Sequence, residues 1–153
     1  MEWWQGIYKA IKDANVRQVA YVPDAGHAKL IQACINDNEI TTISLTTEEE
    51  GVAVLSGAWL GGDRGVLLMQ SAGVGNCVNM FSLAKTCQFP LAVFVTMRGQ
   101  WNEFNPWQLP MGSTTEPTLK TAGFSVNTAE SPDDVADFAS ATLHHAFVGG
   151  EMS

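Results

Sequence analysis

The chain has 153 residues, and eight Lys and Arg against sixteen Asp and Glu give it a formal net charge of −8 at pH 7. This acidity argues against a nucleic-acid partner, since phosphate contacts need clustered Lys and Arg, and no apolar run reaches the roughly 20 residues of a membrane span. The start lacks the pattern of a signal peptide, so we expect one cytoplasmic domain. Cys34, Cys77 and Cys87 show no CxxC spacing and lie in apolar stretches, so we expect three buried free thiols and no metal ligands.

Helix and strand periods alternate along the chain. Helices are predicted at residues 2–14, 28–35, 48–60, 77–86 and 131–147, the last with Ser131 as its N-cap. Strands are predicted at residues 16–22, 41–45, 65–69, 91–96 and 124–126, with one helical turn at 119–123. This alternation indicates the α/β class: a single flavodoxin-like domain with a mainly parallel sheet and helices on both faces.

Residues 97–118 contain Pro and Gly and read as a long irregular loop. Trp101, Phe104, Trp107 and Met111 make this loop too apolar for disorder, so we expect it to cover a site or to form an interface. Only 16% of all residues are charged, against about 25% in a typical soluble domain. A chain with so little charge is expected to bury part of its surface against other chains.

Two short segments follow predicted strands, at the edge where ligands of parallel sheets bind. One contains Glu48, Glu49 and Glu50, and a capping box of Thr46 with Glu49 or of Thr47 with Glu50 explains every glutamate except Glu48. The other is the small-residue turn of residues 70–76, which contains Gly-Val-Gly-Asn. It is neither a P-loop nor a GxGxxG motif, so taken alone it indicates a plain strand-to-helix turn.

Together the two segments form a recognisable pattern. Glu48 lies nine residues before Gly57 in a small-residue helix, which is followed by a strand and then by the turn ending in Gly73-Val74-Gly75-Asn76. This arrangement resembles the pyrimidine-binding (PYR) domain of thiamine diphosphate enzymes. Within that superfamily the motifs look most like the alpha subunits of sulfopyruvate decarboxylases, with the phosphonopyruvate decarboxylases next, and the likeness extends over nearly the whole chain.

The resemblance implies that residues 1–153 form one PYR domain that binds thiamine diphosphate. In the family, a glutamate at the position of Glu48 hydrogen-bonds the aminopyrimidine ring and thereby activates the cofactor. Glu48 is accordingly the expected catalytic residue. The expected cofactor contacts are Glu48, Ser71, Gly73, Gly75 and Asn76.

Substrate contacts implied by the resemblance lie in the turn after the first strand and at the end of the third. They are Asp24, Ala25, His27 and Gln70, and His27 is interpreted equally well as a solvent-facing residue at the start of a helix. Ala25 stands where relatives have a small hydroxyl residue, which departs from the family pattern. Arg98 and Gln108 in the long loop are candidate ligands for an anionic substrate. Arg98 is also interpreted as half of a structural ion pair, and this second interpretation is slightly favoured.

Family enzymes hold the diphosphate and Mg²⁺ with a second domain whose motif runs from Gly-Asp-Gly to Asn. The segment Gly62-Asp63-Arg64-Gly65 lacks this pattern. The resemblance therefore implies a hetero-oligomer in which a PP-domain beta subunit completes the site and Mg²⁺ binds mainly to that partner. The alternatives are a subunit for phosphonopyruvate or another 2-oxo acid, a carboligase, or a non-catalytic flavodoxin-like binding module in which Glu48 is only a helix cap.

Overall fold

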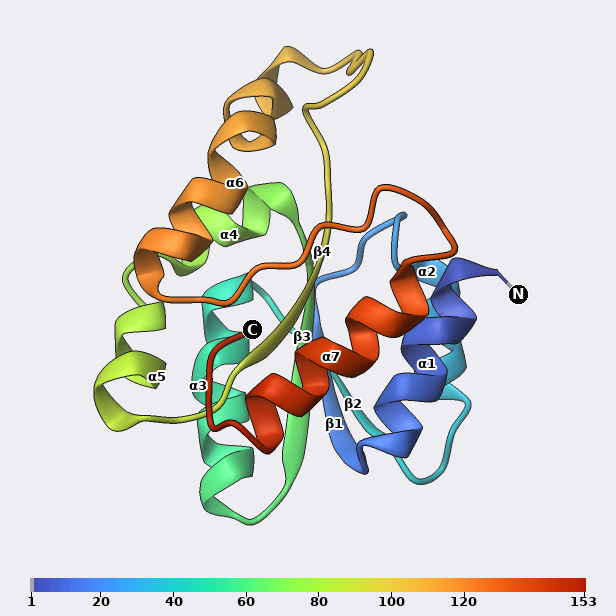
Figure 1. Ribbon diagram of the computed structural model, residues 1–153, viewed down its shortest axis with the longest axis vertical. Helices are drawn as coiled ribbons and strands as arrows, with labels where there is room; N and C mark the ends of the chain where they lie inside the picture. The colour runs from blue at the N-terminus through green and yellow to red at the C-terminus, as the bar shows by residue number, and fades with distance from the viewer. Residues whose placement is uncertain (1) are drawn as a thin grey trace.

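A four-stranded, all-parallel sheet with strand order β2-β1-β3-β4 forms the centre of the computed structural model, which describes residues 2–153 (Figure 1). The strands are β1 (Val16–Tyr21), β2 (Thr41–Ser44), β3 (Arg64–Gln70) and β4 (Ala92–Thr96). The helices are α1 (Trp3–Asp13), α2 (Ala28–Ile35), α3 (Glu48–Leu60), α4 (Ser71–Cys77), α5 (Phe81–Cys87), α6 (Leu109–Ala122) and α7 (Val135–Phe147), with a short 3₁₀ helix η1 (Pro106–Gln108).

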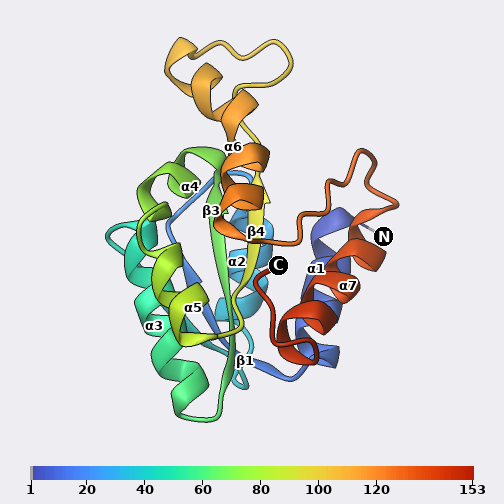
Figure 2. The same cartoon turned by 60° about the vertical axis from the view of Figure 1, so that its left-hand side comes forward.

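Helices cover both faces of the sheet. Helices α1, α2 and α7 pack on one face, and α3, α4, α5 and α6 pack on the other (Figures 1 and 2). Strand β3 supplies residues to both cores, since Val66 and Leu68 face the first layer while Leu67 and Met69 face the second. All four are fully buried, as expected of a central parallel strand. The predicted α/β class with a parallel sheet is confirmed.

Helix α3 begins and ends where the sequence predicted, at residues 48 and 60. The Glu50 carboxylate accepts hydrogen bonds from the backbone N–H groups of Thr46 (2.8 Å) and Thr47 (3.4 Å). Glu50 thus satisfies amide groups that precede the first turn. Glu48 takes no part in this cap, so its burial needs another explanation.

Two predicted irregular segments are helical. Residues 71–77 form α4 directly after β3, and most of the predicted 97–118 loop is η1 and α6, so only residues 97–105 remain irregular. Pro106 and Pro110 suggested a loop, but both stand in the first turn of a helix, where proline is tolerated. Packing of α6 against α4 stabilises a segment whose Gly and Pro content disfavours helix.

The predicted strand at 124–126 is absent, although Ser125 donates a backbone hydrogen bond to Met152 O (3.0 Å). Met152 in turn forms a single parallel bridge with Leu91, next to β4. Beyond this bridge a cavity of about 800 Å³ runs between Val93–Met97, residues 124–129 and α7. The segment therefore lacks the neighbouring strand that a ladder requires.

The last helix also begins later than predicted. Ser131 Oγ donates to the Asp134 carboxylate (3.0 Å) and caps no helix, and α7 starts at Val135. Among residues 2–153, no helix is both long enough and apolar enough to cross a membrane.

Candidate active site

Glu48 is a buried acidic residue at the carboxyl edge of the sheet. It is 6% exposed, at the first position of α3. Asn76 on α4 donates a side-chain hydrogen bond to Glu48 Oε2 (2.8 Å). This contact joins two segments 28 residues apart and brings together two residues that the sequence had assigned to the cofactor.

Gly73 makes the position of Glu48 possible. A Cβ atom at residue 73 would lie 2.5 Å from Glu48 Cγ and 2.6 Å from Glu48 Cδ and Oε1. Real Cβ atoms essentially never approach so closely, so any other residue at position 73 would force the Glu48 side chain out of its present position against α4. Gly75 is less restricted, because a Cβ atom there would first meet Met111 Sδ at 3.4 Å.

A second polar cluster joins the ends of β1 and β4, which are not neighbours in the sheet. Asp24 Oδ2 accepts from Thr96 Oγ1 (2.6 Å) and from the His27 backbone N–H (3.3 Å), and it lies 3.4 Å from His27 Nδ1. His27, Thr96 and the backbone at Gly26 hold the pKa of the Asp24 carboxyl well below its usual range. The Asp24–Thr96 hydrogen bond therefore spans the end of β3, which lies between the two strands.

The structure separates His27 from Glu48. His27 is 2% exposed, its ring lies 6.4 Å from that of Trp3 on α1, and it lines the cavity beside α7. Glu48 lies on the opposite face of the sheet with α3, and the cavity lining includes neither Glu48 nor Asn76. The cavity and the Glu48 pair are thus distinct features.

The other predicted substrate residues lie at the same edge of the sheet. Ala25 is exposed in the turn after β1, and Gln70 ends β3 with a buried Oε1 that has no hydrogen-bond partner among the described residues. Gln108 Oε1 in η1 is likewise buried without a partner in the described part of the chain. Buried acceptors of this kind normally receive a hydrogen bond, so both amides are suited to a ligand.

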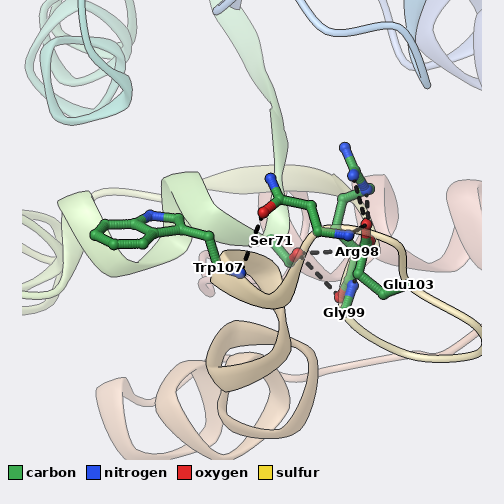
Figure 3. A network of polar contacts seen from close by, with 6 residues as sticks. Ser71, Arg98, Gly99, Glu103 and Trp107 are labelled. Carbon is green, nitrogen blue, oxygen red and sulfur yellow. Dashed lines mark hydrogen bonds and ion pairs between the residues drawn. The ribbon is translucent and has the colours of Figure 1, made fainter.

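Arg98 forms a bidentate ion pair with Glu103, through Nε and Nη2 at 2.8 Å each. Glu103 also accepts from the backbone N–H groups of Gly99 (3.1 Å) and Asn105 (3.0 Å), and its side chain is 6% exposed (Figure 3). The Arg98 backbone N–H donates to Ser71 Oγ (3.0 Å). The ion pair favoured for Arg98 is present, with Glu103 as its partner. Ser71, the first residue of α4, anchors the loop to that helix.

The same loop is closed by close backbone contacts of Gly99 with Gln108 and Gly112. A Cβ atom on Gly99, whose φ is +74°, would lie 2.0 Å from Gln108 O, and one on Gly112 would lie 2.0 Å from Gly99 O. Glycine is required at both positions. We call residues 97–108 the tip loop, and its exposed rings of Trp101, Phe104 and Trp107 the aromatic tip.

The order of the tip loop should depend on pH through Glu103. Arg98 and the backbone amides of Asn105 and Gly99 lower the pKa of the Glu103 carboxyl to about 2, from 4.5 in the absence of these partners. The folded pKa is depressed, so the stabilisation is fully present above about pH 4.5 and is lost as the pH falls toward 2. Hydrogen exchange of residues 98–105, corrected for intrinsic rates, should accelerate in that window. Glu103→Gln, whose side chain does not titrate, should show no such transition, and a transition of equal size in this variant would contradict the assignment.

Two residues of these networks were not found from the sequence. Thr96 had been assigned only to a strand, and Glu103 only to an irregular loop. The sequence did contain a signal for Glu103. It is the sole ionisable residue among residues 99–112, and the cation Arg98 lies five residues before it. Thr96 left no such signal, since its partner Asp24 is 72 residues away.

The Glu48 pair fits the pyrimidine end of thiamine diphosphate. A buried carboxylate with one oxygen hydrogen-bonded to Asn76 leaves Oε1 to share a proton with a ring nitrogen. Gly73 lets the carboxylate and the backbone approach closely. Among residues 2–153, no group of three or more His, Cys, Asp or Glu side chains is arranged to hold a metal ion.

Known proteins share this sequence and fold. The model of the thiamine pyrophosphate enzyme N-terminal TPP binding domain matches residues 1–110. The sulfopyruvate decarboxylase subunit alpha of Methanococcus maripaludis is 37% identical over 131 residues, which cover 85% of this chain and 78% of that protein. The phosphonopyruvate decarboxylase of Streptomyces viridochromogenes is 38% identical over 90 residues, 58% of this chain and 23% of that protein.

A solved structure supports the fold. The 2-oxoglutarate:ferredoxin oxidoreductase from Magnetococcus marinus superposes on 99% of this chain, and on 28% of its own, with a TM-score of 0.76 at 15% sequence identity. This likeness concerns the fold alone, whereas the family model covers both halves of the Glu48–Asn76 pair. The chain therefore belongs to the thiamine pyrophosphate enzyme family and carries its N-terminal TPP binding domain.

Proposed function

We propose that the chain is the alpha (PYR) subunit of a thiamine diphosphate-dependent 2-oxo acid decarboxylase that converts sulfopyruvate to sulfoacetaldehyde and CO₂. The observation that carries the proposal is the buried Glu48 carboxylate, held by Asn76 and accommodated by Gly73 at the carboxyl edge of the sheet. The name of the Methanococcus maripaludis relative supplies the substrate. Residues 1–153 act in this proposal as one PYR domain.

Each residue near α3 and α4 has a defined task in this proposal. Bound thiamine diphosphate supplies the nucleophilic carbon and the electron sink for decarboxylation. Glu48 Oε1 holds a proton at the pyrimidine ring nitrogen, while Asn76 fixes the carboxylate through Oε2. Gly73, Gly75 and Ser71 let the α4 backbone lie close to the cofactor.

In this proposal a second subunit completes the site. The chain lacks the Gly-Asp-Gly to Asn pattern of a diphosphate-binding domain. The Methanococcus maripaludis relative is named a subunit alpha, which implies a partner. In the phosphonopyruvate decarboxylase, the matched region is 23% of one longer polypeptide. We infer a hetero-oligomer in which a PP-domain beta subunit binds the diphosphate together with Mg²⁺.

Substrate recognition is assigned to the ends of β1 and β3. Asp24 is anionic and engaged by Thr96, so in this proposal it orients the turn that carries the exposed Ala25 toward the substrate. The buried His27 acts on this turn through Asp24. The Gln70 amide provides an unpaired acceptor nearby on β3. Arg98 is neutralised by Glu103, so the charge that binds the anionic end of the substrate would come from the partner subunit.

Phosphonopyruvate is the second candidate substrate, because a phosphonopyruvate decarboxylase is 38% identical over 90 residues. The non-catalytic alternative explains Glu48 only as a helix cap. It is disfavoured because Glu50 makes the cap and Glu48 is buried against α4. The proposal places the protein in the cytoplasm, where thiols stay reduced. Burial raises the pKa of Cys34 and Cys77 to about 12, whereas Cys87 is exposed and the prediction that it is buried was wrong.

The deciding experiment is an assay of the purified pair of subunits, with thiamine diphosphate and Mg²⁺, against a panel of 2-oxo acids. We expect CO₂ release and aldehyde formation from sulfopyruvate, and neither product when the cofactor or the beta subunit is omitted. A preference for phosphonopyruvate would transfer the assignment to that substrate. No turnover of any 2-oxo acid by an assembled pair would contradict the decarboxylase proposal.

A further inference from the structure

The three most exposed large apolar side chains among residues 2–153 all belong to the tip loop. Trp101, Phe104 and Trp107 are 96%, 89% and 86% exposed. Fully buried aromatic side chains cover about 150–250 Å² each, so the three rings offer on the order of 600 Å². A standard interface buries about 800 Å² on each partner, so the tip alone supplies most of one interface side.

The tip loop is held in one conformation although its rings face solvent. Glu103 accepts four hydrogen bonds, two from the Arg98 side chain and two from backbone amides (Figure 3). Asn105 Oδ1 accepts from the Trp107 backbone N–H (3.2 Å), and Gly99 is locked against Gln108 and Gly112. A loop fixed in this way presents its rings without the ordering cost that a mobile lid would incur on closing.

The charge of the tip loop also suits an interface. Glu103 is the sole ionisable side chain among residues 99–112, and Arg98 neutralises it. The whole chain, by contrast, carries a net charge of −8. Interface cores are depleted in charge and enriched in Trp, Phe and Arg, and Arg98 lies 5.7 Å from the centre of the Phe104 ring.

The position of the loop links it to the candidate active site. The loop follows β4 and stands beyond the rest of the molecule at the carboxyl edge of the sheet (Figures 1 and 2). Ser71 ties it to α4, the same helix that carries Asn76 and so contacts Glu48. A protein that binds the aromatic tip therefore lies over the carboxyl edge of the sheet, where Glu48 is located.

We propose that the aromatic tip docks into an apolar pocket of the diphosphate-binding beta subunit and thereby positions that subunit over Glu48. This inference rests on the proposed function, which requires such a partner. The partner surface that receives the tip is apolar, of low charge and concave. Charged rims outside the pocket contribute little to affinity compared with the three rings.

The test measures affinity and not activity. The triple variant Trp101→Ser/Phe104→Ser/Trp107→Ser and the control Leu60→Ser/Val148→Ser are each titrated with a purified beta subunit that carries the Gly-Asp-Gly to Asn motif. Leu60 and Val148 are 74% and 67% exposed, at the carboxyl ends of α3 and α7, so both variants remove exposed apolar side chains without touching the core. We expect the triple variant to weaken the Kd at least about 100-fold, and the control to change it less than about threefold.

Glu103→Gln serves as a second variant, because it loosens the loop and keeps the three rings. We expect this substitution to weaken the Kd about tenfold, through the cost of ordering the loop on binding. A triple variant that binds like the unmodified chain overturns the proposal. A triple variant that abolishes self-association of this chain but leaves the Kd for the beta subunit unchanged also overturns it, since a second copy of the chain then binds the aromatic tip. A pair that assembles through the tip but decarboxylates nothing refutes the proposed function and leaves the docking site standing.

Discussion

Glu48→Gln should lower kcat for decarboxylation by about 10²- to 10⁴-fold, the contribution typical of a group that positions or transfers a proton. Glutamine keeps the size of the side chain and an acceptor for Asn76, so α3 and the α3–α4 contact should persist. What is lost is the carboxylate oxygen that shares a proton with the pyrimidine. Steady-state kinetics of the assembled pair at saturating thiamine diphosphate and Mg²⁺ would measure the effect.

Glu49→Gln is the matched control for this prediction. It makes the same chemical change one residue later in the first turn of α3, where the side chain is exposed. We expect its kcat to stay within about threefold of the unmodified pair, because a single first-turn carboxylate contributes only about 0.3–1 kcal/mol to the helix. Equal activities of the two variants would mean that Glu48 is structural, as the binding-module alternative holds.

Gly73→Ala should displace the same carboxylate without removing it. The new Cβ atom would lie 2.5–2.6 Å from three atoms of Glu48, so either Glu48 or α4 must shift. A displacement of about 1 Å at a reacting group can cost about 10²-fold in rate, and overpacking costs about 1–3 kcal/mol of stability. We expect both a large fall in kcat and a lower midpoint of thermal unfolding.

Gly57→Ala provides the control, because a Cβ atom at residue 57 in α3 would meet nothing within 4 Å. Replacing a helical glycine by alanine at such a site stabilises by about 0.5–1 kcal/mol. The midpoint of unfolding should rise and kcat should be unchanged. If Gly73→Ala behaved like Gly57→Ala, the close fit of Glu48 against α4 would not matter for activity.

Local patterns predicted the elements that depend on nearby residues. Helix α3 has its predicted bounds because a capping carboxylate and a run of small and apolar residues act within a few positions of one another. Only one turn at 119–123 was predicted of helix α6, and the rest of the helix was missed for the opposite reason. Its helical state depends on α4, which lies more than 30 residues earlier, and its Pro and Gly residues locally indicate a loop.

The residues of the candidate site also differ in whether local sequence or long-range packing determines their positions. Glu48, Gly73 and Asn76 were selected by spacing and by resemblance, and the structure brings these three together. His27 was assigned to the substrate side by its position in the turn after β1, but its side chain lies under Trp3 on the face opposite α3. Which face a turn residue enters depends on how the helices pack, and a linear motif does not encode that choice.

By itself, the sequence determined the α/β class, the parallel strands, the glutamate left outside the helix cap and the absence of a diphosphate-binding motif. Only the tertiary structure decided that Arg98 is neutralised, that Thr96 holds Asp24 across 72 residues, and that three aromatic rings project from a rigid loop. The first group arises from contacts within a few residues and from side-chain periodicity. The second arises from segments that meet because β1, β3 and β4 end at one edge of the sheet, and these long-range contacts fix which charges are paired and which apolar surfaces remain exposed.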